Sequence, residues 1–444
     1  MLTPELARDR AMQAIDRARA AGADAADAVL SADTGTGVSV RLGAVEDVER
    51  TEGEELSLRV FCGQRTASVS STRLGDADLA DLAARVVAMA RAAPEDRWAG
   101  LAPEDRLMKG SAPDLDIWDG GAVDPEALRQ RALAVEDAAR AVAGVTNSEG
   151  GSASAHAAVV ALVTSHGFAA AYRATSYSLA ASVIAGTGSA MQRDSASHSA
   201  RYQAALDAAE AIGRKAGERA VARLDPVKLG SGAMPVVYDR RIASGLLGHF
   251  ASAIAGPAIA RGTSFLKDAM GARVFAPGIE IVDDPHRPRG LRSRPFDGEG
   301  LPVSPMTLVD DGMLETWLLD AASARQLGLE PTGHASRGGG VSTSNLYMAA
   351  GHVPRDTLIG EIERGLYVTS LFGQGVNGLT GDYSRGATGF LIEHGEITRP
   401  VAEITIAGNL KDMYLALTPA SDLEFRYGVN APTVRIDGMT IAGA

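Results

Sequence analysis

The segment Gly365–Glu393, GLYVTSLFGQGVNGLTGDYSRGATGFLIE, decides the fold class, because two architectures would use its glycines differently. Gly373, Gly375 and Gly378 match the G-x-G-x-x-G of a dinucleotide-binding loop. That loop holds a pyrophosphate only when a helix follows it and offers free N–H groups. Here three more glycines occur in the next eleven residues, and each would cost a helix about 1 kcal/mol. The segment therefore predicts a strand, a loop and a second strand rather than a nicotinamide site.

The overall composition is that of a folded, acidic protein. Of the 444 residues, 45% are hydrophobic and 22% are charged, which is ordinary for a globular chain. The formal net charge of -12 opposes binding to nucleic acid, whose phosphates require a clustered cationic face. The one basic run, His286–Arg294, is interrupted by proline and glycine and is interpreted as a solvated loop. We therefore expect no nucleic-acid partner.

The cysteine content and the N-terminal sequence indicate a cytoplasmic protein. The single cysteine, Cys62, excludes an intrachain disulfide and fits a reducing compartment. The first ten residues carry charges where a secretory signal would need an apolar segment. The longest nearly uncharged run, residues 244–260, contains a histidine, a proline and three glycines, and is too short and polar to span a bilayer. We expect no membrane contact.

Hydrophobic periodicity predicts two domains, with the break at Asp225-Pro226. The first, residues 1–224, should begin with a helix from Thr3 to Gly22, continue through an antiparallel meander of short strands, and end with a helix over 202–224. The second, residues 225–444, should be β-rich with a helix from about Arg240. Together these patterns predict an α+β fold of two domains, each with a largely antiparallel or mixed sheet and flanking helices.

Short catalytic patterns give little support for an independent hydrolase. Ser264-Phe-Leu-Lys267 matches the S-x-x-K of serine acyl-enzymes, but the companion motifs S-D-N and K-T-G are absent. The eight histidines include no pair four residues apart, which a zinc-binding helix would use. His249 stands alone on its predicted helix without a glutamate, and we interpret it as a hydrogen-bonded packing residue. A metal site assembled by the fold from scattered ligands stays open.

Four linked segments stand out in the second half of the chain: Arg294–Gly300, Gly373–Gly378, Gly381–Gly386 and Ile404–Met413. In this order they resemble the TldD/TldE (PmbA) family of bacterial metallopeptidase subunits, and specifically its TldE or PmbA branch. In that family a TldD subunit binds zinc through His-Glu-x-x-x-His on a helix and a further cysteine near its C-terminus. The corresponding positions here are Gly248, His249 and Ala253, and the region 421–427 has no cysteine. The resemblance therefore implies a chain that binds no cofactor itself, beside a zinc-bearing TldD-like partner.

The glycine-rich segments are the candidate binding surface. An extended peptide could add to their exposed backbone as a strand, and an arginine could meet a carboxylate. The candidate peptide or partner contacts are Arg337, Gly338, Gly339, Gly373, Gly375, Asn377, Gly378, Gly381, Asp382, Tyr383, Ser384, Arg385 and Gly386. The alternative is that the glycines only permit tight turns and close packing between strands.

The resemblance implies a role in proteolysis, but no catalytic residue in this chain. We expect a zinc-free subunit that joins a TldD-like subunit to degrade or process peptides and unfolded proteins. A different class is also open, namely a stand-alone homodimeric peptide-binding protein without catalysis. An independent metallopeptidase with unrecognised ligands is the third interpretation.

Overall fold

The computed structural model describes residues 2–120, 123–337, 339–373 and 375–443. The first half is built on one sheet of long strands: β1 (Ala25–Arg41), β2 (Ala44–Cys62), β3 (Arg65–Ser71), β4 (Val145–Thr164), β5 (Ala169–Ala185) and β6 (Gln192–Ala200). Their order is β3-β2-β1-β4-β5-β6, and every neighbouring pair is antiparallel.

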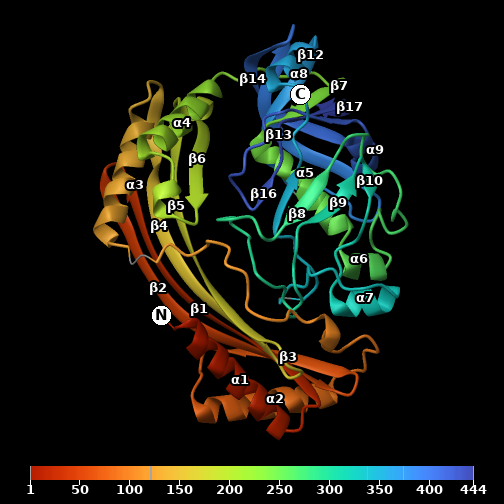
Figure 1. Cartoon of the computed structure of the whole chain (residues 1–444). Helices are drawn as coiled ribbons and strands as arrows, with labels where there is room; N and C mark the ends of the chain where they lie inside the picture. Colours follow the sequence, from red (N-terminus) through yellow and green to blue (C-terminus); the bar gives the residue numbers. More distant parts are fainter. Residues whose placement is uncertain (1, 121–122, 338, 374, 444) are drawn as a thin grey trace.

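Helices cover one face of this sheet. They are α1 (Pro4–Ala20), α2 (Asp76–Ala92), α3 (Pro125–Arg140) and α4 (Ala209–Ala222). Ala28 and Leu30 of β1 pack with α1 and α2, whereas Val38 and Val40 pack with α3 and α4. These even-numbered side chains share a face because side chains alternate along a strand. Figure 1 shows the strands arching past the C-terminal half, which lies on the side away from the helices.

The second half contains a ring of strands and a smaller sheet. Its strands are β7 (Gly232–Tyr238), β8 (Ile281–Asp284), β9 (Met306–Asp310), β10 (Met313–Leu314), β11 (Asn345–Met348), β12 (Arg364–Phe372), β13 (Asp382–Glu393), β14 (Glu396–Asn409), β15 (Leu417–Pro419), β16 (Val429–Asn430) and β17 (Val434–Ala442). β14, β13, β12, β7 and β17 pair in that order, and β17 also pairs with β14, which closes the ring. The smaller sheet has the order β10-β9-β8-β11-β16.

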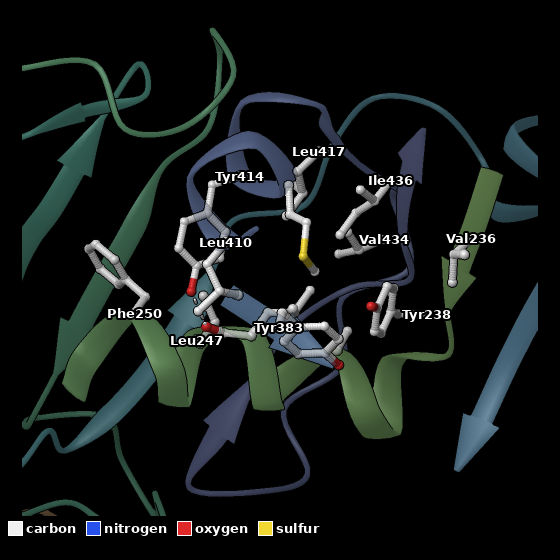
Figure 2. Close-up of a cluster of buried hydrophobic side chains, with 14 of the residues drawn as sticks. Val236, Tyr238, Leu247, Phe250, Tyr383, Leu410, Tyr414, Leu417, Val434 and Ile436 are labelled. Atoms are coloured by element: carbon white, nitrogen blue, oxygen red, sulfur yellow. Dashed lines mark hydrogen bonds between the residues drawn. The ribbon is translucent and has the colours of Figure 1, made fainter. Parts of the chain in front are cut away.

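The core of the second half packs on one central helix. The helices here are α5 (Arg240–Ala253), α6 (Gly256–Ala260), α7 (Ala321–Leu327), α8 (Arg355–Gly360) and α9 (Leu410–Leu415). Figure 2 shows apolar and aromatic side chains gathered over α5. Phe275 and Tyr414 stack with ring centroids 4.4 Å apart, and the Tyr414 hydroxyl donates to the Leu246 carbonyl at 3.0 Å. This packing fixes the position of α5 against the strand ring.

The predicted α+β class, with antiparallel and mixed sheets, is confirmed. The meander is formed by longer strands than expected, because most of β2 from Ala44 to Glu55 is exposed and lacks an alternating apolar pattern. The polar strand β6 was missed for the same reason, and the helix expected over 202–224 begins only at Ala209. The domain break at Asp225 stays a prediction. No helix in the described ranges is long and apolar enough to cross a membrane.

Candidate functional site

Helix α5 carries the positions at which the resemblance places the zinc ligands. The Asp239 carboxylate caps the helix by accepting from the Arg241 N–H at 2.9 Å. Buried residues then recur at helical spacing on the face toward the core: Ala243, Leu246, Leu247, Phe250 and Ala253. His249 is half-buried beside this face, and Gly248 is exposed, with open space where a side chain would point.

A small cavity of about 240 Å³ lies at the C-terminal end of α5. It brings together two groups of predicted residues, namely His249 and Ala253 from the helix and Gly378 and Arg385 from the glycine-rich segment. The other lining residues are Ser252, Thr263, Ser264, Phe265, Val376 and Leu410. Residues from the helix and from the glycine-rich segment, far apart in the sequence, therefore line one cavity.

The segment between β12 and β13 is folded back on the start of β13. The Gly375 carbonyl accepts from the Ser384 N–H at 2.6 Å, and the Gly381 N–H donates to the Asn377 carbonyl at 2.8 Å. The Gly378 carbonyl accepts from the N–H of Phe265 at 3.0 Å. These backbone groups bond within the chain, and tight turns or close packing account for Gly373, Gly375 and Gly381. Addition of a peptide strand to this backbone stays a prediction.

Close packing is most severe at Gly375. A Cβ atom there would lie 1.7 Å from the Ser384 carbonyl oxygen, so no other residue fits without movement of the backbone. Gly373 and Gly381 have left-handed φ angles of 77° and 86°, which disfavour a side chain for a different reason. Gly386 lies opposite Phe372 in the β12–β13 ladder. Gly378 is unlike these, with nothing within 4 Å of its missing side chain.

Strand alternation divides the four polar candidates of β13 between its two faces. Tyr383 and Arg385 point toward α5, and Tyr383 is only 2% exposed. Its ring meets that of His249 edge-to-face, with centroids 6.1 Å apart (Figure 2 shows Tyr383 beside α5). Asp382 and Ser384 are exposed on the other face. Tyr383 is therefore a packing residue of the cavity wall, and Arg385 is the polar candidate that reaches the cavity.

The exposed carboxylate of Asp382 has a structural role. It accepts from the Thr380 hydroxyl at 2.6 Å and from the Asn409 amide at 3.1 Å. These hydrogen bonds, that of Thr380 first, lower the pKa of Asp382. The carboxylate thus ties the end of the loop to the N-cap residue of α9.

The imidazole of His249 is held neutral. Burial lowers its pKa, and the positive charge of Arg385 lowers it further. The neutral ring can accept or donate a hydrogen bond within the cavity, but it carries no charge near neutral pH.

The donor set at this end of α5 does not fit zinc. Zinc in proteins takes three or four nitrogen, sulfur or carboxylate ligands, whereas Gly248 and Ala253 offer none and His249 offers one ring. Arg385 adds a positive charge to the same cavity. Within the described ranges, no group of three or more His, Cys, Asp or Glu side chains is arranged to hold a metal ion.

Ser264 does not have the geometry of an activated nucleophile. Its hydroxyl donates to the Ala253 carbonyl at 2.5 Å and accepts from the Leu266 N–H at 3.0 Å. The side chain is 2% exposed, while Lys267 is exposed. Residues 264–267 therefore form a turn whose Ser264 side chain is hydrogen-bonded to the C-terminal end of α5, and the S-x-x-K match does not indicate a catalytic serine.

Arg337 lies away from the cavity, in an ion cluster between the two halves. Its guanidinium is 2.6 Å from the Asp27 carboxylate of β1, which also binds Arg59 of β2. It donates to the Ser57 carbonyl at 3.2 Å as well. Glu299 completes the cluster 3.8 Å from Arg59. Because Arg337 is already paired, its contact with a peptide carboxylate stays a prediction.

Gly339 follows Arg337 with a left-handed φ of 90° and open space around it. Gly338, the remaining candidate of this segment, lies outside the described residues. The structure therefore uses Arg337 to join the halves, and it does not bring this segment to the cavity of His249.

Six of the ten described residues that line the cavity were not among the candidate site residues. Thr263 and Phe265 come from the turn after α6, and Leu410 comes from α9. Leu410 lies inside the family-like segment Ile404–Met413, so that motif was the available signal. Thr263 and Phe265 carry none, because only the fold brings their turn to the loop.

Comparison with known proteins agrees with the segments that suggested the family. Models of the PmbA/TldA metallopeptidase domains match residues 26–90 (domain 1), 118–224 (central domain) and 231–443 (C-terminal domain). The metalloprotease PmbA of Escherichia coli O157:H7 is 40% identical over 422 residues, which cover 95% of this chain and 92% of that protein.

Two crystal structures have the same fold. A protein of Bacteroides thetaiotaomicron described as a candidate modulator of DNA gyrase superposes with a TM-score of 0.93 at 29% identity, covering 100% of both chains. TldE of Thermococcus kodakarensis superposes with a TM-score of 0.85 over 98% of this chain and 100% of that chain; at 20% identity this likeness concerns the fold alone.

The matched domains account for most of the chain, and the four family-like segments all lie within the C-terminal match. The E. coli relative is 40% identical to this chain over 95% of its length. The chain belongs to the PmbA/TldD metallopeptidase family.

Proposed function

We propose that this chain is a zinc-free, TldE/PmbA-like subunit that joins a zinc-bearing TldD-like subunit to process peptides and unfolded proteins in the cytoplasm. The observation that carries this proposal is the end of α5. One neutral imidazole and a nearby arginine occupy the position where the resemblance places a zinc site. Because one imidazole and one arginine cannot hold zinc, a peptidase complex that contains this chain would need its zinc site on another subunit.

The cavity of His249 is the part that would serve substrate or partner. It lies beside the β12–β13 loop, where Phe372 and Leu379 are 51% and 58% exposed. Large apolar side chains exposed on a well-bonded loop are suited to an interface. Arg385 supplies a cation at the cavity that could orient a carboxylate.

The first experiment is recovery of the tagged chain at its native level from its own cells, with quantitative mass spectrometry. We expect a partner in equal amount that carries His-Glu-x-x-x-His, and elemental analysis of the complex should give one zinc per pair. Recovery of the chain only with itself would overturn the heteromeric proposal and favour a homodimeric binding protein. Zinc bound to this chain alone would also overturn it.

The second experiment asks whether the cavity contributes to proteolysis. In the reconstituted complex, Arg385→Gln should lower kcat/KM for an unfolded-protein substrate by about tenfold, equivalent to about 1.4 kcal/mol. Arg399→Gln is the matched control, because Arg399 is an exposed arginine of the neighbouring strand β14 and is paired with Glu393. Equal turnover by the two variants would remove the cavity from the substrate path.

A further inference from the structure

A second cavity, of about 870 Å³, lies between the two halves of the molecule at the other end of α5. Its walls come from β6 and α4 of the first half and from β12, the start of α5 and residues 422–433 of the second half. Among the described residues, seven arginine or lysine side chains and five carboxylates line it. The lining is therefore polar, with an excess of positive charge.

Every carboxylate of this cavity already has a partner. Asp194 pairs with Arg223 at 3.0 Å, Asp239 with Arg241 at 2.9 Å, and Glu424 with Arg240 at 2.8 Å. The two others behave alike: Asp207 binds Arg426, and Asp422 accepts from the N–H and hydroxyl of Thr433. The excess charge is thus carried by side chains that these acids do not neutralise.

Three of the seven cations form no ion pair with these five acids, namely Lys215, Arg219 and Arg355. Arg355 pairs with Asp356 outside the lining at 3.2 Å, which leaves Lys215 and Arg219 of α4. Within the described part of the chain neither forms an ion pair, and the protein contact of the Arg219 guanidinium is the Ser195 carbonyl at 2.9 Å. They are four residues apart, so they lie on one face of the helix with Cβ atoms about 6 Å apart.

Lys215 is exposed and Arg219 is half-buried. Partial burial lowers the pKa of both and neighbouring arginines lower it further, whereas Glu424 near Lys215 and Asp194 and Asp239 near Arg219 raise it in part. An entering anion would relieve this repulsion.

A buried hydroxyl without a partner lines the same cavity. Among the residues that the structure describes, none forms a hydrogen bond with the Oγ1 atom of Thr369. Thr369 is the extra residue of a β-bulge, because Val368 pairs with Gly389 and Ser370 pairs with Thr388. Bulges redirect a side chain out of the strand alternation. A buried polar group left unpaired destabilises the folded chain, and a hydrogen bond to a ligand oxygen would offset that cost.

We propose that this cavity is an oxyanion-binding site in which Lys215 and Arg219 hold a carboxylate or phosphate group of a small molecule and Thr369 donates to it. Arginine recognises such groups through paired N–H donors, and lysine adds a point charge. The cavity is within the size range of small-molecule sites, which is about 300–1,000 Å³. The site is separate from the His249 cavity and does not depend on a peptidase partner.

The test is calorimetric titration of the purified full-length chain at low ionic strength. The probes are inorganic phosphate, the dipeptide Gly-Gly and its C-terminal amide. We expect saturable binding of phosphate, of the dipeptide or of both, and none of the amide. Preference between the first two identifies the source of the oxyanion.

Three variants decide the location. Arg219→Gln and Lys215→Gln should each weaken binding by at least about tenfold. Arg214→Gln should leave it within about twofold, since Arg214 is an exposed cation of the same helix that does not line the cavity. Circular dichroism verifies folding, and Lys215→Gln, which breaks no bond, keeps the test decisive if Arg219→Gln is unstable. Equal weakening by Arg214→Gln, or no saturable binding by any probe, would overturn the proposal.

Discussion

Helix α5 ends in two different environments. At its N-terminal end, Asp239 and Arg241 face a wide, charged cavity between the two halves. At its C-terminal end, His249 faces a smaller cavity built within the second half, where Arg385 is the only charged side chain among the described lining residues. The helix is continuous, so the elements that pack against each end set the difference. Contact between the halves produces the charged cavity, and the folded β12–β13 loop produces the other.

The largest effect is expected from the charged end. Asp239→Ala removes the cap of α5, the partner of Arg241 and the acceptor of the Tyr367 hydroxyl at 2.5 Å. Because Arg241 is largely removed from solvent and would keep only the more distant Asp194 carboxylate at 3.9 Å, we expect the free energy of unfolding to fall by about 4 kcal/mol in denaturant titration. Asp239→Asn keeps the cap and should lose less. A loss of the same size in both variants would assign the effect to charge alone.

Asp239 also predicts an acid dependence. Burial opposes its charge, but Arg241 and the hydrogen bond from Tyr367 together lower its pKa below the ordinary 3.8. Its contribution to stability is therefore present above the unfolded pKa and is lost as the pH falls through the lower folded value. The stability difference between Asp239→Asn and the unaltered chain should shrink in acid. A difference that is constant with pH would contradict the charge argument.

Glu299 lies outside both cavities and contrasts with Asp239, because its buried negative charge is not fully offset by Arg59. Burial raises the pKa of Glu299 from 4.5 to about 7, against the attraction of Arg59. The folded chain holds this proton more tightly than the unfolded chain, so its stability falls as pH rises from 4.5 to about 7. Glu299→Gln should remove that loss and stabilise the protein by up to about 3 kcal/mol at pH 8. Melting curves at pH 5 and pH 8 measure it, and an equal effect at both would refute the titration.

The wall of the smaller cavity is tested by paired glycine substitutions. Gly375→Ala places a methyl group against the Ser384 carbonyl and should cost about 2 kcal/mol, with faster proteolysis of the β12–β13 loop. Gly378→Ala meets open space and should change both quantities little. If the two variants behaved alike, the loop would not be held as tightly as its hydrogen bonds indicate.

The smallest effect is a shift of one titration. Arg385→Gln should raise the pKa of His249 toward its ordinary 6.5, because the arginine is one of the two causes that lower it. Titration of the imidazole by NMR measures this change. Arg399→Gln is again the control, and a rise of the same size in it would show that the interaction is not local.

The sequence predicted the class of the fold, and it supplied four of the residues that line the smaller cavity without predicting the cavity itself. The glycines that follow Gly378 excluded a helix. Gly378 and Arg385 came from the family-like segments and His249 and Ala253 from the helix positions of the zinc motif, and the structure brings these four together. Lys215 and Arg219 gave no such signal, because a polar helix face has the same pattern whether it faces solvent or another domain. Thr369 was equally hidden, since a bulge depends on pairing register with a partner strand.

The strand ring can close only late in synthesis, because β7 pairs with strands that are made long after it. β7 ends at Tyr238, yet one of its two neighbours, β17, begins only at Val434. Both edges of β7 lack a strand to pair with until β12 has been made, and one edge stays unpaired until β17 follows. The helix-covered sheet of the first half needs nothing beyond α4 and can form much earlier. During translation the nascent chain therefore carries one finished half beside one with an open edge, and that edge is where a chaperone, or a second nascent chain, would bind.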